Sequence, residues 1–260
     1  MAHVLGIDIG GTGVKAAPVD TNIGELLAAR QKIETPRPAT PEAVTSVVEQ
    51  LVTSFKWTGQ AGITFPGVVV DGVIKTAANL DPSWIGTDAV KAFSTGTKLA
   101  VTVLNDADAA GVAEVEFGAG KDVSGTVLLL TFGTGIGSAL FIDGRLVPNT
   151  EFGHIEIRGK DAEKRASELA RETHDLSWGS WAGRVDEYLE HMEGMLSPDL
   201  IIIGGGVSRK AEKFLPLLSG LRAKIVAAAM LNDAGIVGAA LAVERTSGRR
   251  SLQGAPERAI

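Results

Sequence analysis

Two glycine-rich turns are the segments of this sequence whose residue types and spacing could do chemistry. The first reads Asp8-Ile9-Gly10-Gly11-Thr12-Gly13, and the second reads Thr131-Phe132-Gly133-Thr134-Gly135-Ile136-Gly137. Each turn lies between two extended, apolar segments, so both are predicted to be tips of β-hairpins. Glycine allows positive φ values and close backbone approach, so that successive N–H groups converge on an anion, and threonine hydroxyls add donors. The two turns therefore predict a phosphate-binding site with donors on two sides.

Other nucleotide-binding motifs fit these turns less well. The chain has no Gly-x-x-x-x-Gly-Lys-Ser/Thr motif, so it is not expected to be a P-loop NTPase. Gly11-Thr12-Gly13 lacks the third glycine and the following helix of a dinucleotide fingerprint. Ordinary hairpins use the same glycines, but an acid at the end of the first strand and the pair Asn105-Asp106 after a third strand favour phosphate chemistry.

Composition limits the class of protein and its partners. The chain has 260 residues, a formal charge of −6 and no cysteine, which excludes disulfides, thiol nucleophiles and cysteine-based zinc sites. The negative charge argues against nucleic acid and anionic membranes as partners. The sequence has no apolar run of about 20 residues and starts in a strand without a basic leader, so we expect a cytoplasmic protein.

The elements that must position these residues alternate between strands and helices. Thr40 is predicted to cap a helix whose apolar face continues to Phe55. The predicted strands are 4–9, 14–19, 26–34, 62–65, 99–104, 126–132, 137–142 and 200–203, and the predicted helical regions are 107–117, 161–196, 207–219 and 233–245. This order indicates an α/β chain of two lobes with a cleft between them. We place the lobes at 1–106, a small lobe, and 107–260, a larger one.

Five motifs, in this order along the chain, resemble the repressor, open reading frame and sugar kinase (ROK) family. They are Asp-x-Gly-Gly-Thr from Asp8, Asn-Asp-Ala from Asn105, Thr-x-Gly-Thr-Gly-x-Gly from Thr131, Glu-x-Gly-His from Glu151 and Gly-Gly-Gly from Gly204. The resemblance covers roughly residues 4–242. It implies the two-lobed actin, Hsp70 and hexokinase fold, which is ribonuclease H-like and has a central cleft, and it implies a sugar kinase activity.

Three segments resemble, more narrowly, the polyphosphate-dependent glucokinases, a group that includes polyphosphate/ATP glucomannokinases. They are Thr64-Phe65-Pro66-Gly67-Val68-Val69, Thr76-Ala77-Ala78-Asn79-Leu80-Asp81 and Ser83-Trp84-Ile85-Gly86. The cysteine-rich zinc motif of many ROK proteins is missing, so we expect no zinc. No helix-turn-helix precedes Val4, which argues against a sugar-responsive repressor. Because members of the family often pair, a homodimer is one expected state.

Asp106 is the candidate catalytic base. Phosphoryl transfer to a hydroxyl needs neutralised phosphate charge, in-line positioning and a group that takes the hydroxyl proton. A carboxylate just past a strand can accept that proton from the sugar 6-hydroxyl, while Asn105 offers an amide to adjacent hydroxyls. The alternative for Asp106 is a buried helix cap, because the segment from Ala107 is predicted to be helical.

The phosphate side is assigned to the two turns. Asp8 is suited to orient Mg²⁺ through water, because that ion prefers hard oxygen ligands and keeps several waters; the alternative is an ordinary turn acid. Lys15 could meet the donor phosphates or extend into solvent from its strand. The expected backbone and hydroxyl contacts are Gly10, Gly11, Thr12, Gly13, Thr131, Gly133, Thr134 and Gly135.

The sugar side is assigned mainly by the resemblance. It implies that Glu151 and His154 contact the sugar, and carboxylates with an imidazole suit a hydroxyl-rich ligand. It also implies a further glutamate, for which Glu168 is the first choice and Glu156 the second. Asn79 lies in a loop, 76–87, that is either a covering loop or a wall of the substrate cleft.

Two further segments carry open alternatives. Gly204-Gly205-Gly206 resembles the family's adenosine site, where missing side chains let a purine lie against the backbone; a plain strand-to-helix turn is the competing interpretation. The charged stretch 158–172 is typical of a solvated helix face. Its alternative is a track for long polyphosphate, shared with Trp178, Trp181 and Arg184.

The sequence thus predicts an enzyme that transfers a phosphoryl group from inorganic polyphosphate or ATP to the 6-hydroxyl of glucose, with Mg²⁺ as cofactor. Mannose is a second candidate acceptor. The alternatives are an N-acetylhexosamine kinase of the same fold and a non-catalytic, sugar-binding regulator.

Overall fold

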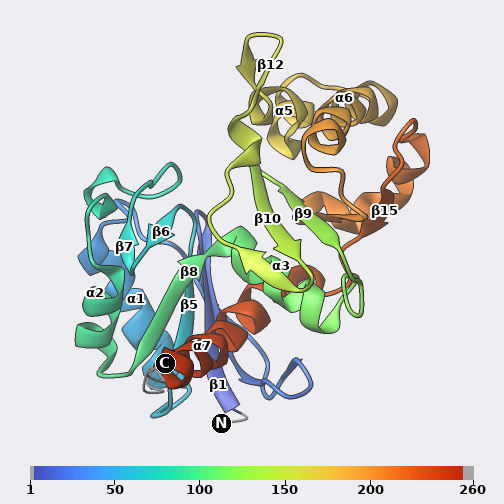
Figure 1. The fold of residues 1–260 in the computed structure, drawn as a ribbon. Helices are drawn as coiled ribbons and strands as arrows, with labels where there is room; N and C mark the ends of the chain where they lie inside the picture. Colours follow the sequence, from blue (N-terminus) through green and yellow to red (C-terminus); the bar gives the residue numbers. More distant parts are fainter. Residues whose placement is uncertain (1–2, 254–260) are drawn as a thin grey trace, which may run out of the picture. The chain divides into compact units, whose positions relative to one another are not determined.

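The computed structural model describes residues 3–253, which belong to two compact units (Figure 1). The first unit combines Met1–Ala110 with Gly235–Ile260, and the second is Gly111–Ala234. The first boundary lies four residues beyond the one expected from sequence. The units differ from the expected lobes mainly at the C-terminal helix, which belongs to the first unit. No local sequence pattern indicates that this helix belongs to the first unit, because its place depends on which sheet it packs against.

The sheet of the first unit has the strand order β3-β2-β1-β5-β8, with β4 also paired to β2. β1 (His3–Gly10) and β2 (Gly13–Asp20) form an antiparallel hairpin, and β1 pairs in parallel with β5 (Ala61–Phe65), which pairs in parallel with β8 (Val101–Asn105). The single strand predicted over 26–34 is wrong. Two short strands, β3 (Glu25–Leu26) and β4 (Gln31–Ile33), replace it, and the residues between them are exposed.

Helices α1 (Pro41–Ser54) and α2 (Ala89–Thr97) contribute to the core of this unit. The hydroxyl of Thr40 accepts the backbone N–H of Ala43 at 3.3 Å, which confirms the predicted cap. Between the helices lie the hairpin β6 (Val69–Val70) and β7 (Val73–Ile74) and the short helix η1 (Pro82–Trp84). Trp84 is fully buried, packs edge-on against Phe65 at 5.0 Å and donates its indole N–H to the carbonyl of Ala39 at 3.0 Å.

Helix α7 (Ala234–Gln253) packs against the sheet of the first unit, as Figure 1 shows for β1 and β5. Glycines allow the close approach. A Cβ at Gly6 would lie 2.0 Å from the carbonyl oxygen of Ile236, and a Cβ at Gly62 would lie 1.7 Å from that of Ala239. The packing of β1, which leads into the first glycine turn, and of its neighbour β5 therefore depends on a helix that is distant in sequence.

The sheet of the second unit has the order β11-β10-β9-β14-β15. β9 (Thr126–Phe132), β10 (Ile136–Ile142) and β11 (Arg145–Val147) are antiparallel neighbours, whereas β14 (Leu200–Gly204) pairs in parallel with both β9 and β15 (Lys224–Ala227). Strand β14 is buried along its length. The second glycine turn joins β9 to β10, as predicted.

Helices and a short hairpin complete the second unit. The predicted helical region 161–196 is three helices, α4 (Glu163–Ala166), α5 (Glu168–Thr173) and α6 (Trp178–Leu196), because Ser167 and Ser177 interrupt it as N-caps. The predicted amphipathic segment 207–219 forms the 3-10 helices η3 (Gly206–Lys213) and η4 (Leu215–Leu217). The remaining elements are η2 (Phe152–His154), the hairpin β12 (Glu156–Ile157) and β13 (Lys160–Asp161), and η5 (Leu231–Asp233).

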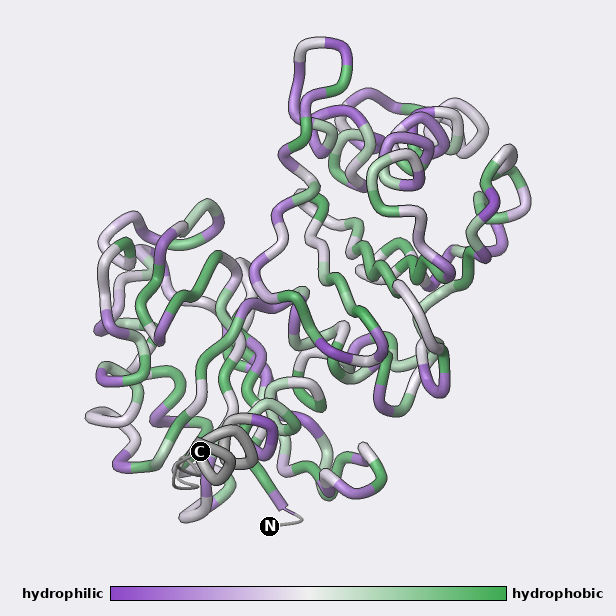
Figure 2. The backbone as a smooth tube through the Cα atoms, in the orientation of Figure 1, coloured by the Kyte–Doolittle hydropathy of each residue, from purple (hydrophilic) through white to green (hydrophobic). Residues whose placement is uncertain are grey.

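Each unit has its own apolar core. Figure 2 shows the sheet strands mainly in green and many connecting turns in purple. Phe65 and Trp84 belong to the core of the first unit, and Phe132 and Trp181 to that of the second. Within the described residues, no helix has the length and apolar character needed to cross a lipid bilayer.

Candidate functional site

The first glycine turn closes the hairpin of β1 and β2, where Gly10 pairs with Gly13. Gly11 lies next to the loop 76–87, since a Cβ on it would lie 3.6 Å from the carbonyl oxygen of Asn79. Gly11, Thr12 and Asn79 are exposed. The structure therefore brings Asn79 to the first turn, although 66 residues of sequence separate Asn79 from Gly13.

Asp8 and Lys15 face each other across the same hairpin. They are register partners, and the Lys15 ammonium lies 3.2 Å from Oδ2 of Asp8. The other oxygen, Oδ1, accepts the hydroxyl of Thr64 at 3.0 Å, and Thr64 in turn accepts the N–H of Ile9. This network fixes a carboxylate and a cation beside the turn. Its oxygen donors suit a hard cation such as Mg²⁺, and because both oxygens already have protein partners, water-mediated contact fits better than direct ligation.

Asn105 and Asp106 mark the junction between β8 and α3 (Asp106–Phe117). Asn105 is buried and its amide holds this junction together: Oδ1 accepts the N–H of Asp108 at 3.0 Å and Nδ2 donates to the carbonyl of Gly67 at 3.1 Å. Oδ1 of Asp106 accepts the N–H of Ala107 at 2.9 Å. The structure thus places Asp106 at the first residue of a helix, with its backbone anchored by Asn105.

The second glycine turn is held from within and from α5. The N–H of Gly133 donates to the carbonyl of Gly135 at 3.0 Å, and the carbonyl of Gly133 accepts the N–H of Leu169 at 3.0 Å. A Cβ placed on Gly133 would meet no atom within 4 Å. The space above Gly133 is therefore open, while its backbone is fixed.

The triple glycine lies beside the strand that leads into that turn. Gly204 pairs with Thr131, and a Cβ on Gly205, whose φ is +80°, would lie 2.3 Å from the carbonyl oxygen of Phe132. Only glycine fits this position without a shift of backbone. The structure therefore brings together two segments that the sequence assigned to the phosphoryl donor.

Glu151 and His154 form one end of an acidic cluster. Nε2 of His154 lies 3.6 Å from Glu151, and Nδ1 lies 3.5 Å from Asp161 and 3.9 Å from Oε1 of Glu163. His154, Asp161 and Glu163 offer ligand atoms within 4.8 Å of one another, the one such group in the part of the chain described here. Lys164 already neutralises Asp161 at 3.3 Å, and Glu163 accepts a backbone N–H, so partners within the protein explain the cluster.

Partial burial raises the pKa of the Glu151 carboxyl, whose side chain is 40% exposed. The neighbouring His154 lowers that pKa and the negative charge of Glu163 raises it, with burial the largest influence. The Asp161 pKa is lowered, chiefly by its hydrogen bond to Lys164. Of these two carboxyls, Glu151 is therefore the one whose charge is lost first as the pH falls.

The two candidates for the further sugar contact lie on different elements. Glu168 begins α5, lies 3.6 Å from the ammonium of Lys210 and would be 3.0 Å from a Cβ on Gly206. Glu156 is an exposed residue of β12 that pairs with Asp161. Glu168 thus lies at the triple-glycine turn. Both assignments to the sugar stay predictions.

Most of the charged stretch is engaged within the protein. Arg158 and Arg165 both bind Glu187, and Arg184 donates to the carbonyl of Arg165. Trp181 is fully buried. Trp178 is partly exposed, and its ring lies 4.4 Å from the guanidinium of Arg171 and 5.8–5.9 Å from the ammonium groups of Lys213 and Lys210. The track alternative thus retains Trp178 and these three cations, of which Arg171 also pairs with Glu172 and Lys210 with Glu168.

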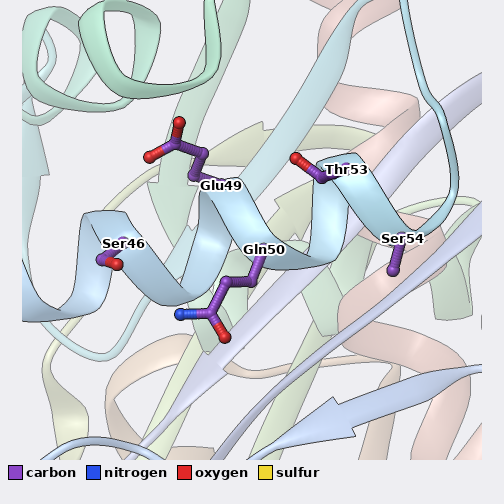
Figure 3. A pocket seen from close by; sticks show the side chains of 5 residues that line it. All are labelled: Ser46, Glu49, Gln50, Thr53 and Ser54. Carbon is purple, nitrogen blue, oxygen red and sulfur yellow. The ribbon is translucent and has the colours of Figure 1, made fainter.

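Two surface hollows differ in what lines them. One, of about 420 Å³, lies along α1, and its lining residues all come from that helix: Ser46, Glu49, Gln50, Thr53 and Ser54 (Figure 3). A single helix brings no groups from separate elements together, so we assign it no function. The other, of about 190 Å³, lies beside the second turn and is lined by Thr134, Glu163, Lys164, Ser167, Leu169, Ala170, Thr173 and His174.

Sequence reasoning missed Thr64 and Glu163. Thr64 is fully buried and holds Asp8, but a threonine inside a buried strand carries no local sign of that contact. Glu163 looked like one of several acids on a solvated face. In the structure its side chain is 26% exposed and reaches the N–H of Ile136, in the neighbouring hairpin. The contact depends on tertiary packing that no spacing in the sequence reports.

Comparison with known proteins assigns the family. The model of the ROK family matches residues 4–168. A polyphosphate glucokinase of Mycobacterium tuberculosis (strain CDC 1551 / Oshkosh) is 52% identical over 243 residues, covering 92% of this chain and 91% of that protein. The structure of an inorganic polyphosphate/ATP-glucomannokinase from Arthrobacter sp. strain KM is similar with a TM-score of 0.91 and 47% identity, covering 95% of this chain and all of the other.

A ROK family glucokinase from Streptomyces griseus, solved with glucose and AMPPNP, is more distant. It has a TM-score of 0.78 and 26% identity, covering 92% of this chain and 98% of the other. These structures share the actin/hexokinase-like α/β fold, which confirms the fold class expected from sequence. The glycine turns, the Asn105-Asp106 junction and the Glu151–His154 pair all lie within the matched residues, and this chain belongs to the ROK family.

Proposed function

We propose that this protein is a polyphosphate- or ATP-dependent glucokinase. It transfers a phosphoryl group to the 6-hydroxyl of glucose, with mannose as a second candidate acceptor. The observation that carries this proposal is the 52% identity to polyphosphate glucokinases over 92% of the chain. The similarity to a polyphosphate/ATP-glucomannokinase, with a TM-score of 0.91, supports both donors and the second acceptor.

Asp106 is the proposed general base. At the start of α3 its carboxylate is anchored locally by the N–H of Ala107, and the buried amide of Asn105 fixes the backbone beneath it. A carboxylate fixed in this way can accept the proton of the sugar 6-hydroxyl as that oxygen attacks phosphorus. Asn105 and Asn79 are proposed to contact the sugar. Because the Asn105 side chain is engaged at both ends, its contribution is to hold the junction as much as to bind hydroxyls.

The glycine turns are the proposed phosphate contacts. Backbone N–H groups and threonine hydroxyls stabilise charge on the transferred group because they are fixed before the reaction. Lys15 adds a cation to the first turn, and the open space above Gly133 admits a ligand at the second. Asp8 would hold Mg²⁺ through water. When bound, the ion would neutralise phosphate charge and align the donor.

Glu151 and His154 are the proposed sugar contacts in the second unit. A carboxylate accepts two hydroxyl hydrogens, and an imidazole either donates or accepts, so the pair can distinguish sugars by the hydroxyls they carry. Glu168 is the proposed third contact. Gly204-Gly205-Gly206 is proposed to lie against the nucleoside when ATP is the donor.

The test is the formation of glucose 6-phosphate from glucose and Mg²⁺ with ATP, with polyphosphate and with neither. Activity with polyphosphate supports the full proposal, and activity with ATP alone restricts it to a glucokinase. No product with either donor rejects it. Competition between glucose and N-acetylglucosamine tests the alternative that the protein is an N-acetylhexosamine kinase. Replacing glucose with mannose tests whether mannose is a second acceptor. We expect this reaction to take place in the cytoplasm. We expect the protein to form a homodimer, and light scattering measures its oligomeric state.

A further inference from the structure

Glu114 is a fully buried acid of α3 whose carboxylate ends among backbone N–H groups. Its Oε2 accepts the N–H of Ala119 at 2.8 Å and that of Ala229 at 3.1 Å, and its Oε1 accepts the N–H of Met230 at 2.7 Å. A hydrogen bond to an ionised acceptor is stronger than a neutral one, and the low dielectric of the interior strengthens it further. The Glu114 side chain therefore joins the end of α3 to the segment after β15, 115 residues away along the chain.

The segment that Glu114 holds, 229–232, is a strained turn at the surface. Ala229 is exposed, and Leu231 is 50% exposed with a φ of +48°. A leucine rarely adopts a positive φ, and it does so where the surrounding structure imposes that conformation. The N–H groups of Ala229 and Met230, directly before Leu231, are the ones that donate to Glu114. Glu114 therefore fixes the backbone that enters this turn.

The same segment lies beside the triple-glycine turn. Ala228 donates its N–H to the carbonyl of Ile203 at 2.9 Å, and a Cβ on Gly204 would lie 3.8 Å from the Cβ of Ala228. Farther along the chain, η5 lies close to η3, whose first residue is Gly206. Strand β14, which leads into the triple glycine, lies between β9 and β15 in the sheet. The side of the turn away from β9 is therefore formed by the segment 228–233.

We propose that Glu114 is a positioning residue for ATP as the phosphoryl donor. By fixing the segment 228–233, it fixes one wall of the site where the triple glycine is proposed to meet the nucleoside. A polyphosphate chain carries no nucleoside, so its binding does not depend on that wall. The inference rests on the proposed function for the identity of the donors, whereas the hydrogen bonds of Glu114 are a property of the protein alone. Glu114 thus sets the use of ATP relative to polyphosphate.

Glu114→Gln tests this role with little change in side-chain size. Two N–H groups donate to Oε2, so the amide oxygen takes that place and the NH₂ group faces the N–H of Met230, which loses its acceptor. We expect the KM for ATP to rise roughly 10-fold. The KM for polyphosphate and the KM for glucose should stay within about twofold of the parent. Glu114→Asp keeps the charge but shortens the side chain, which withdraws the carboxylate from Met230, so we expect the same selective rise.

Glu190→Gln, a charge-neutralising change on the exposed face of α6, is the matched control and should leave all three KM values unchanged. Equal rises in the KM for ATP and the KM for polyphosphate in Glu114→Gln would mean that the variant loosens the fold, and would overturn the inference. So would a KM for ATP within about twofold of the parent. If the protein uses ATP alone, the KM for glucose is the reference for this comparison. If it uses polyphosphate alone, the inference is rejected and the proposed function stands.

Two further measurements do not depend on turnover. Amide hydrogen exchange followed by NMR should show roughly 10-fold faster exchange at Met230 in Glu114→Gln, with Ala119 protected as in the parent. Calorimetric titration with AMPPNP should show weaker binding, and titration with tripolyphosphate should show unchanged binding. Unchanged exchange at Met230, or unchanged AMPPNP binding, rejects the positioning role even if the protein phosphorylates no sugar. Absence of kinase activity with faster exchange and weaker AMPPNP binding rejects only the proposed function.

Discussion

Asp106 is the side chain on which the proposed phosphoryl transfer depends most. Asp106→Asn keeps the size of the side chain and an oxygen that can accept the N–H of Ala107, but it removes the base. We expect turnover to fall roughly 10²- to 10⁴-fold with little change in glucose binding. Steady-state kinetics and calorimetric glucose titration measure the two effects. Asp71→Asn, an exposed turn residue, is the control, and near-normal turnover of Asp106→Asn would remove Asp106 from this role.

The raised pKa of Glu151 predicts an acid limit to sugar binding. As the pH falls through that pKa, which lies above the ordinary value of 4.5, the carboxylate is protonated and accepts hydroxyl hydrogens less well. We expect kcat/KM for glucose to fall on the acid side at a pH above 4.5, and Glu151→Gln to lack that decline. The parent and variant pH profiles measure this, and parallel profiles would contradict it.

The effect of Glu151 on stability has the opposite dependence on pH. Because folding raises this pKa, the native state favours the protonated form. The contribution of Glu151 to the free energy of unfolding is fully present below its pKa in the unfolded chain. It is lost as the pH rises through its pKa in the folded protein. The proposed contact of Glu151 with the sugar is thus strongest at the pH values at which Glu151 supports the fold least.

At the scale of elements, the two turns proposed to contact the phosphoryl donor use glycine for different reasons. Gly133→Ala adds a methyl group to open space, so we expect stability close to that of the parent and a donor KM raised roughly 10-fold or more. Gly205→Ala pushes a Cβ into the backbone of Phe132 from a positive φ, so we expect a loss of about 2–4 kcal/mol in unfolding free energy. Urea denaturation and donor kinetics of both variants measure this contrast.

Two outcomes for Gly133→Ala would contradict the proposed phosphate contact. If Gly133→Ala destabilises the protein as much as Gly205→Ala, then the space above Gly133 is not free to admit a ligand. If Gly133→Ala leaves donor kinetics unchanged, the ligand does not approach that position. Either outcome removes Gly133 from the proposed phosphate site.

Elements with a strong local signal could be predicted from sequence, and those set by tertiary contacts could not. The hairpins at both glycine turns and the cap at Thr40 follow from residue types at short spacing. The break of the 161–196 region at Ser167 was missed, although a serine that caps a new helix is a local feature. The placement of Glu163 at Ile136 requires α4 to pack beside β10, which no local pattern encodes.

At the scale of the whole molecule, the division of the chain into units is set by α7. Gly62→Ala would place a Cβ 1.7 Å from the carbonyl oxygen of Ala239, backbone against backbone, so we expect a loss of about 3 kcal/mol or more in unfolding free energy. Gly194→Ala, inside α6, is the control. Its added Cβ meets no atom within 4 Å, so we expect this substitution to raise the unfolding free energy by about 0.5–1 kcal/mol. Chemical denaturation compares them, and equal stabilities would show that α7 does not pack this closely.

Helix α7 also determines when the first unit can form during synthesis. All residues of the second unit leave the ribosome before Ile236 and Ala239 reach Gly6 and Gly62. Until then the sheet that carries Asp8 lacks one of its covering helices, and the junction at Asp106 belongs to an unfinished core. The nascent chain therefore cannot hold a complete first unit before α7 has been made. The proposed base becomes usable only after both units have been synthesised.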